Sequence, residues 1–115
     1  MTRMIEVKHV EPKEQVRTLI EGLINRLEER LGHFRKDSVS VHALFEENGS
    51  HTLYRTSVTC HIPGHMIAAR EESRNAGVSI RKAFAELERQ VARQTARFRQ
   101  KTRVKRMAGP EPLEA

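Results

Sequence analysis

The spacing of apolar residues changes twice along this chain of 115 residues, and this is the feature that most restricts its fold. In residues 16–31, apolar side chains recur every three or four positions and so share one face of a helix. In residues 39–46 and 53–62, apolar and polar side chains alternate, which is the period of a strand with one buried face. The helical spacing returns in residues 80–98. The sequence therefore predicts strands placed between two amphipathic helices.

Two shorter strands and two turns complete this pattern. Residues 5–8 alternate between apolar and polar side chains, which predicts an N-terminal strand that ends before Pro12. Asn48-Gly49 favours a tight hairpin between the two alternating segments, and Pro63-Gly64 favours a second turn. Residues 66–72 are then predicted to return as a fourth strand.

The predicted order is β-α-β-β-β-α, with a break at residues 73–77 before the last helix. Because each helix has one apolar face, both are expected to cover the same side of a four-stranded antiparallel sheet. We therefore predict an α+β domain of two layers, the general plan of double-stranded RNA-binding domains. The domain is expected to span residues 1–106. Residues 107–115, which are rich in glycine and proline, are expected to form a disordered tail.

Positive charge is concentrated late in the chain. Residues 1–77 hold 11 basic and 11 acidic side chains, whereas residues 78–106 hold 10 basic side chains against Glu86 and Glu88. The second segment therefore carries a charge of +8, and two later glutamates bring the whole chain to +6. Such a segment attracts polyanions by releasing their counterions. Nucleic acid is therefore the first partner to consider and an acidic membrane surface the second.

The basic side chains of the last predicted helix gather opposite its apolar stripe. At about 100° per residue, four of them fall within about 80° of one another, and others extend the charge beyond Phe98, the last apolar anchor. If six of these side chains contact phosphates, affinity should fall about a thousandfold between 50 and 200 mM salt by the rule for duplex DNA. The residues predicted to contact nucleic acid are Lys82, Arg89, Arg93, Arg97, Arg81 and Lys101.

The single cysteine and its neighbouring histidines do not form a pattern that predicts a metal centre. Cys60 and His61 are adjacent on a predicted strand and so point to opposite faces, which separates them as ligands even though His65 is close in sequence. Cys60 shares its face with Val58 and Ile62, which indicates a buried and unreactive thiol. We expect no metal site and no disulfide.

The histidines of the two central strands, His42, His51 and His61, are predicted to be surface residues. His42 is expected to meet His51 or His61 across the exposed face of the hairpin, where the rings could stack on bases or contact phosphates.

No residue pattern predicts an enzyme or a cofactor. Glu21, Glu28 and Glu29 fall on the exposed side of the first helix, where a solvated face accounts for them. The six glycines are scattered singly, so there is no glycine-rich phosphate loop. No apolar run approaches the roughly 18 residues of a membrane span, and the N-terminus lacks the apolar stretch of a signal peptide. We therefore expect a cytoplasmic protein that has no membrane or small-molecule partner.

The order of several short motifs is similar to that of a known family. The stretch Glu86-Leu87-Glu88-Arg89-Gln90, with Ile80 before it and two arginines after it, resembles the last helix of the ribosome hibernation-promoting factors. These are also called ribosome-associated inhibitor or sigma-54 modulation proteins. The segments Glu46-Glu47-Asn48-Gly49 and His61-Ile62-Pro63-Gly64 are similar to that family too. The likeness covers roughly residues 4–100, and the chain resembles a short form without the C-terminal dimerisation domain.

The resemblance implies a domain that occupies the decoding region of the small ribosomal subunit. There it would exclude messenger RNA and transfer RNA and so inhibit translation in resting bacterial cells, without breaking any bond. The resemblance also implies that Lys82, Arg89, Arg93 and Arg97 contact ribosomal RNA. We expect a monomer, and pairing through an edge strand of the sheet is the alternative. Residues 75–81 depart from the usual opening of this helix in the family, but Asn75 is suited to cap it.

Two other functions fit the same residues. A general double-stranded RNA-binding module would bind free duplexes as readily as ribosomes, and competition with free duplex RNA separates these functions. A protein-interaction module would use the exposed sheet face or the acidic side of the first helix. Charge reversal on the last helix would leave that interaction intact.

Overall fold

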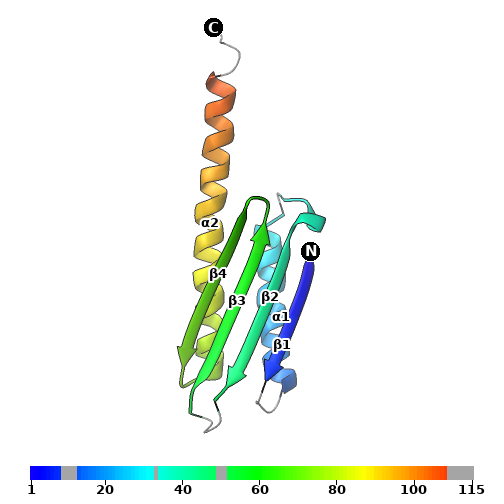
Figure 1. Ribbon diagram of the computed structural model, residues 1–115, viewed down its shortest axis with the longest axis vertical. Coiled ribbons are helices and arrows are strands. Elements are labelled where there is room, and N and C mark those ends of the chain that lie inside the picture. Colours follow the sequence, from blue (N-terminus) through cyan, green and yellow to red (C-terminus); the bar gives the residue numbers. More distant parts are fainter. Residues whose placement is uncertain (9–12, 33, 49–51, 109–115) are drawn as a thin grey trace.

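The computed structural model describes the chain except for residues 9–12, 33, 49–51 and 109–115, and except for the side chains of residues 13 and 98–108. Its elements confirm the predicted order β-α-β-β-β-α (Figure 1). Along the chain they are β1 (Thr2–Lys8), α1 (Lys13–Arg30), the short 3₁₀ helix η1 (Lys36–Ser38), β2 (Ser40–Glu47), β3 (Tyr54–Ile62), β4 (His65–Ser73) and α2 (Ala76–Ala108).

The four strands form one sheet in the order β1-β2-β3-β4. β2, β3 and β4 are antiparallel neighbours, whereas β1 runs parallel to β2. The prediction of an entirely antiparallel sheet is therefore wrong for the first pair of strands. The reason is that α1 carries the chain back along the sheet after β1, so β2 starts at the same end as β1 (Figure 1).

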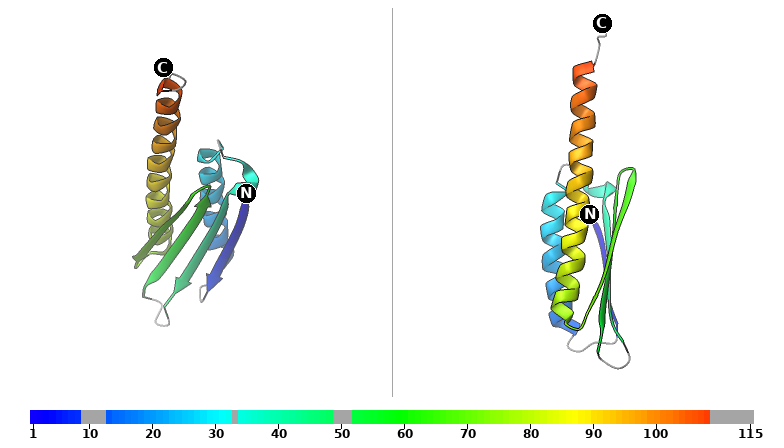
Figure 2. Two further views of the ribbon diagram at one scale, coloured as in Figure 1. Left: turned by 45° about the horizontal axis from the view of Figure 1, so that its top comes forward. Right: turned by 90° about the vertical axis from the view of Figure 1, so that its left-hand side faces the viewer.

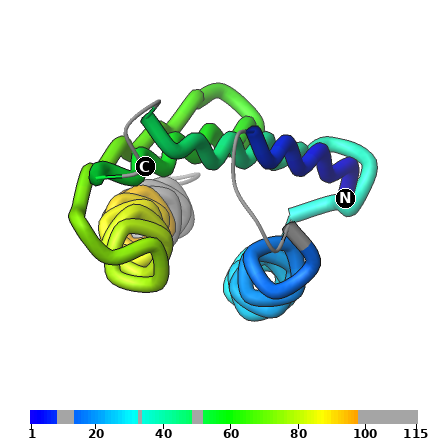
Figure 3. Tube along the Cα trace, turned by 90° about the horizontal axis from the view of Figure 1, so that it is seen from below, coloured from blue at the N-terminus to red at the C-terminus, as the bar shows by residue number. Residues whose placement is uncertain are grey.

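Both helices lie on the same side of the sheet, as predicted (Figures 2 and 3). Their apolar stripes meet the inward face of the sheet in one core. The prediction of a two-layer α+β domain is confirmed. The largest fully buried side chains of this core are Phe45, Phe84, Ile20, Ile24, Leu27, Ile80, Leu87, Val41, Val58, Val91, Thr56 and Cys60.

The strands bury alternate side chains on the faces that their sequence period predicted. Val41, Ala43 and Phe45 of β2 are all buried, with exposed or half-buried residues between them. The register of β4, which the sequence left open, places Ile67 opposite Cys60 of β3. This pairing puts the apolar side chains of β4 into the same core.

One polar pair lies inside the core and was not predicted. The hydroxyl oxygens of Thr56 and Ser79 are 2.8 Å apart, and the Ser79 hydroxyl donates to the carbonyl oxygen of Glu71 at 3.1 Å. Both side chains are fully buried. A buried hydroxyl is costly unless it is hydrogen-bonded, so this pair fixes the start of α2 against β3 and β4.

The turn between β3 and β4 is the tight one that the sequence predicted. Ile62 pairs with His65, so only Pro63 and Gly64 lie between the two strands. Gly64 has φ = 81°, a conformation that glycine adopts readily and that the second central position of a type II turn requires.

The connection between β2 and β3 has six residues, as many as lie between the predicted strands at residues 39–46 and 53–62, but it is not the tight hairpin that Asn48-Gly49 favoured. Glu47 pairs with Tyr54, which leaves six residues between the strands instead of a tight turn at Asn48-Gly49. Oδ1 of Asn48 accepts a hydrogen bond from the backbone N–H of Leu53 at 3.3 Å, so this side chain bridges the connection. Gly49 lies outside the described residues.

The second helix begins within the predicted break at residues 73–77, because Asn75 caps it. Oδ1 of Asn75 accepts a hydrogen bond from the backbone N–H of Val78 at 3.0 Å, and its carbonyl oxygen accepts one from Ser79 at 3.0 Å. This is the geometry of a helix N-cap, and it starts α2 at Ala76. The break is therefore shorter than expected.

α2 has 33 residues and α1 has 18, so α2 extends past the rest of the domain (Figures 1 and 2). Its first part packs against β3, β4 and α1. Its backbone stays helical through Ala108, and residues 109–115 of the expected tail lie outside the described part. Neither of the two α-helices, as far as the structure describes them, has an apolar segment long enough to cross a membrane.

Candidate nucleic-acid interface

Four of the predicted contact residues form one surface on α2, which we call the α2 basic face: Lys82, Arg89, Arg93 and Arg97. All four side chains are exposed. The N-cap fixes where α2 begins, and its buried stripe, which runs from Ile80 to Val91, fixes its rotation on the sheet. With about 100° per residue, the four cations occupy an arc of about 80° on the side away from the core. They are therefore presented together to solvent on a rigid support.

The other two predicted contact residues are not placed on this face. Arg81 is exposed but lies about 80° around the helix from Arg89, next to Glu88, which contacts α1. Lys101 lies in the extended part of α2, where the structure describes the backbone and not the side chains.

An acidic residue, Glu86, lies within the same arc and holds Arg89. Nε and Nη2 of Arg89 donate to Oε1 of Glu86 at 3.0 and 2.8 Å, and Nη2 also donates to Oε2 at 2.8 Å. Nε2 of Gln90 donates to Oε2 of Glu86 at 3.0 Å. These hydrogen bonds, first from Gln90 and then from Arg89, hold the pKa of Glu86 below its ordinary value, so the carboxylate is charged at neutral pH.

Two arginines of α1 extend the positive surface, and the sequence reasoning missed them. Nε of Arg26 and Nε of Arg30 lie 3.2 and 3.3 Å from the two carboxylate oxygens of Glu88 on α2. The Glu88 side chain is only 12% exposed, whereas the arginine side chains are 60% and 51% exposed. Glu88 therefore holds two largely exposed guanidinium groups along the seam between the helices. Their i, i+4 spacing beside the apolar stripe was a usable signal, but the many glutamates of the same helix obscured it.

The three glutamates expected on the exposed side of α1 have different environments. Glu21 and Glu29 are exposed. Glu28 is half-buried, and its Oε1 lies 2.8 Å from Nη2 of Arg3 on β1. Glu28 therefore ties α1 to the edge of the sheet and is not a free member of an acidic face.

The face of the sheet opposite the helices carries His42 and His61, which are both exposed. Nε2 of His42 lies 2.6 Å from Oε1 of Glu6 on the neighbouring strand. His61 is opposite Ser40 in the register, so it is not the direct cross-strand neighbour of His42 that the sequence suggested. His51, the other expected partner, lies outside the described residues.

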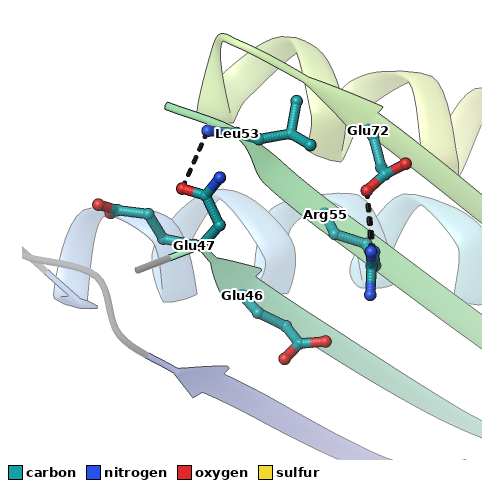
Figure 4. A pocket seen from close by; sticks show the side chains of 6 residues that line it. Glu46, Glu47, Leu53, Arg55 and Glu72 are labelled. Carbon is teal, nitrogen blue, oxygen red and sulfur yellow. Dashed lines mark hydrogen bonds and ion pairs between the residues drawn. The ribbon is translucent and has the colours of Figure 1, made fainter. Parts of the chain in front are cut away.

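A pocket of about 110 Å³ opens at the ends of β2 and β3 (Figure 4). Its acidic side chains come from β2 and β4, and Nη2 of Arg55 pairs with Oε2 of Glu72 across it at 3.0 Å. Among the residues that the structure describes, no three His, Cys, Asp or Glu side chains are grouped so that they could hold a metal ion. The lining residues are Glu46, Glu47, Asn48, Leu53, Arg55 and Glu72.

The environment of Cys60 matches the buried thiol that the sequence predicted. The side chain is fully buried, whereas His61 is exposed on the opposite face. Burial raises the pKa of the Cys60 thiol to about 11, so the thiol stays protonated at neutral pH. A protonated and inaccessible thiol is a poor nucleophile.

Comparison with known proteins gives a family and a fold. Residues 4–99 match the model of the family described as sigma 54 modulation protein / S30EA ribosomal protein. The structure is similar to the N-terminal domain of Protein Y from Thermus thermophilus, with a TM-score of 0.65 and 20% identity over 81% of this chain and 98% of that one. It is also similar to a ribosomal subunit interface protein from Coxiella burnetii, with a TM-score of 0.64 and 20% identity over 84% of this chain and 99% of that one. The comparison with curated protein sequences gave no match.

Proposed function

Because this chain belongs to the sigma 54 modulation protein / S30EA ribosomal protein family, we propose that it binds the small ribosomal subunit and inhibits translation by occupying the decoding region. Occupancy excludes messenger RNA and transfer RNA, and no bond is formed or broken. The observation that carries this proposal is the α2 basic face, where four exposed cations share one side of a helix anchored to the core.

The spacing of these cations suits a phosphate backbone. Arg89, Arg93 and Arg97 follow one another every four residues, which corresponds to a rise of about 6 Å along the helix axis for each step. Arginine can donate two parallel hydrogen bonds to one phosphate group. Arg26 and Arg30, held by Glu88, add donors from α1 at the seam between the two helices. The helix layer therefore offers several arginines to one RNA surface.

The proposed binding surface includes the remaining basic residues of the late segment. In this proposal, Arg81 widens the surface on the side of α1. Lys101 lengthens it along the later part of α2, whose backbone continues past the sheet (Figure 1). The protein acts in this proposal as a cytoplasmic monomer in resting cells, where it contacts ribosomal RNA and catalyses no reaction.

Cosedimentation with isolated small ribosomal subunits at low and high salt tests the proposal. We expect binding at low salt that weakens steeply as salt rises, because phosphate contacts release counterions. We also expect initiator transfer RNA to compete with the protein. Absence of binding at low salt would refute a ribosomal function, and binding that transfer RNA does not displace would refute the decoding region as the site.

Free duplex RNA as a competitor separates this function from general duplex binding. A ribosome-specific protein should stay on the subunits in the presence of excess duplex. Displacement by an equal concentration of duplex would favour the general RNA-binding module instead.

A further inference from the structure

Glu86 is held in place within the α2 basic face by more contacts than an ordinary surface glutamate. Its two carboxylate oxygens together accept three contacts from Arg89 and one from Gln90, at 2.8 to 3.0 Å. The side chain is 31% exposed, half the exposure of Arg89. The carboxylate is thus fixed, and it neutralises an arginine of the surface that we propose to bind RNA.

Gln90 anchors this arrangement to the sheet. The same Nε2 that donates to Glu86 also donates to the carbonyl oxygen of Ala68 on β4 at 3.0 Å. Because Ala68 lies on the edge strand, the position of Glu86 depends on how α2 packs on the sheet, as well as on the helix itself. The geometry of the Glu86–Arg89–Gln90 cluster therefore depends on the tertiary structure and not on α2 alone.

We propose that Glu86 sets the selectivity of the α2 basic face for structured RNA over a plain phosphate backbone. This inference rests on the proposed function. A backbone that offers only phosphates must either break the contacts of Nε and Nη2 of Arg89 with Glu86 or bind through Nη1, and in both cases it faces the negative charge of Glu86. An RNA site that offers an acceptor to Arg89 and an amino donor to Glu86 can engage both side chains and replace the lost contact.

Base edges provide this combination of groups. Guanine presents O6 and N7 acceptors to arginine, and the N4 amino group of cytosine donates to a glutamate carboxylate. Regular A-form RNA hides these edges in a deep and narrow groove, whereas loops, bulges and helix ends expose them. Glu86 therefore favours folded RNA with exposed guanine and cytosine edges, and disfavours regular duplex.

The test compares Glu86→Gln with Glu21→Gln, an exposed glutamate of α1 whose substitution changes the net charge by the same amount. Binding to a 20-base-pair RNA duplex of random sequence and to small ribosomal subunits is measured for both variants at 0.1 M salt. We expect Glu86→Gln to bind the duplex about eightfold more tightly than wild type, the effect of one added phosphate contact at that salt concentration. Binding to subunits should change less than about threefold, and Glu21→Gln should leave both affinities near wild type.

A double variant, Glu86→Gln with Arg89→Gln, shows whether the gain comes through Arg89, since it should remove the gain on duplex.

Elution from immobilised heparin gives a readout that is independent of the ribosome, and Glu86→Gln should elute at higher salt than Glu21→Gln. If the two variants elute at the same salt concentration, Glu86 does not restrain Arg89. If Glu86→Gln binds the duplex and the subunits more tightly by the same factor, Glu86 does not set the selectivity. If the wild type binds no subunits, the proposed function fails while the duplex and heparin measurements still decide whether Glu86 restrains Arg89.

Discussion

Arg93 and Cys60 show how burial gives individual residues of this protein different roles. Arg93 is exposed on α2, so its charge can act on a partner without any effect on packing. Cys60 is fully buried on β3, so its chemistry is suppressed and its volume contributes to the core. At the scale of the residue, changes at these positions should therefore affect binding and stability separately.

Reversal of charge at Arg93 should weaken binding to small subunits without unfolding the domain. Arg93→Glu removes one cation from the α2 basic face and adds an anion, so we expect a loss of about tenfold or more at 0.1 M salt. Cosedimentation measures the affinity, and thermal unfolding should match the wild type. The control is Arg17→Glu, an equal charge change at an exposed site on α1. Equal binding by both variants would contradict the role of the α2 basic face.

The thiol of Cys60 should resist modification in the folded protein. Its pKa is raised to about 11 by burial, so at pH 8 we expect slow labelling by a thiol reagent in buffer and rapid labelling in urea. The unfolded thiol ionises near its ordinary pKa of 9.0, while the folded thiol stays protonated. Ionisation of the Cys60 thiol in the unfolded chain therefore lowers the free energy of unfolding as the pH rises from about 9 to about 11.

Cys60→Ala provides the control for that pH dependence, because it removes the ionising group. The variant should lose less stability than the wild type over the same pH range. Rapid labelling of the native protein at pH 8 would show that the thiol is accessible.

At the scale of the element, α2 has two tasks that lie in different parts of its length. Its first part is capped, packed on the sheet and anchored by a buried stripe. Its last part extends past the sheet and continues the basic sequence through residues 100–108, beyond the end of the family match at residue 99. The first part determines folding, and we propose that the last part adds charge to RNA binding.

Loss of the helix cap should destabilise the domain modestly. Asn75→Ala removes the side-chain acceptor for the backbone N–H of Val78, which costs about 1 kcal/mol in the free energy of unfolding. Urea denaturation measures this value. Asn75→Asp keeps an acceptor at the same position and should stay within a few tenths of a kcal/mol of wild type. Equal losses of stability in the two variants would show that the side-chain acceptor at position 75 does not account for the loss.

Neutralisation of the extended part of α2 should reduce the salt dependence of subunit binding. The slope of log affinity against log salt is negative, and its magnitude should decrease by about 0.9 for each substituted side chain that contacts a phosphate. Cosedimentation over a series of salt concentrations measures the slope, and an unchanged slope would exclude this part from the interface. The residues to replace together with glutamine are Lys101, Arg103, Lys105 and Arg106.

At the scale of the whole molecule, one core connects the sheet to both helices. Phe84 of α2 and Phe45 of β2 are among its largest fully buried side chains. Because the arginines of the helix layer come from both helices, the whole of the proposed binding surface is assembled only when this core holds α1 and α2 side by side on the sheet (Figure 3). Stability and function should therefore be lost together when the core is damaged.

Phe84→Ala tests this dependence. Truncation of a buried phenylalanine costs about 3–5 kcal/mol in the free energy of unfolding, a large part of the stability of a small domain. Urea denaturation should show that loss, and subunit binding should weaken in proportion to the unfolded fraction. Undiminished binding by a largely unfolded variant would mean that the basic segment acts without the fold.

The sequence alone determined which segments are helices and strands, which side chains face the core, and where positive charge is concentrated. These properties depend on the period of apolar residues and on charge along the chain, so Val41, Phe45 and the four cations of the α2 basic face could be predicted. The cap at Asn75 was also visible, although the helix starts earlier than the pattern of Ser73–Gly77 suggested.

The tertiary structure alone decided which distant residues meet. The parallel pairing of β1 with β2, the hold of Glu88 on Arg26 and Arg30, and the hydrogen bond from Gln90 to Ala68 join residues from different elements. Periodicity gives the direction of a side chain relative to its own helix or strand, but not the element against which it packs. Those contacts follow from the packing of whole elements around the core, and they turn a basic segment into a shaped surface.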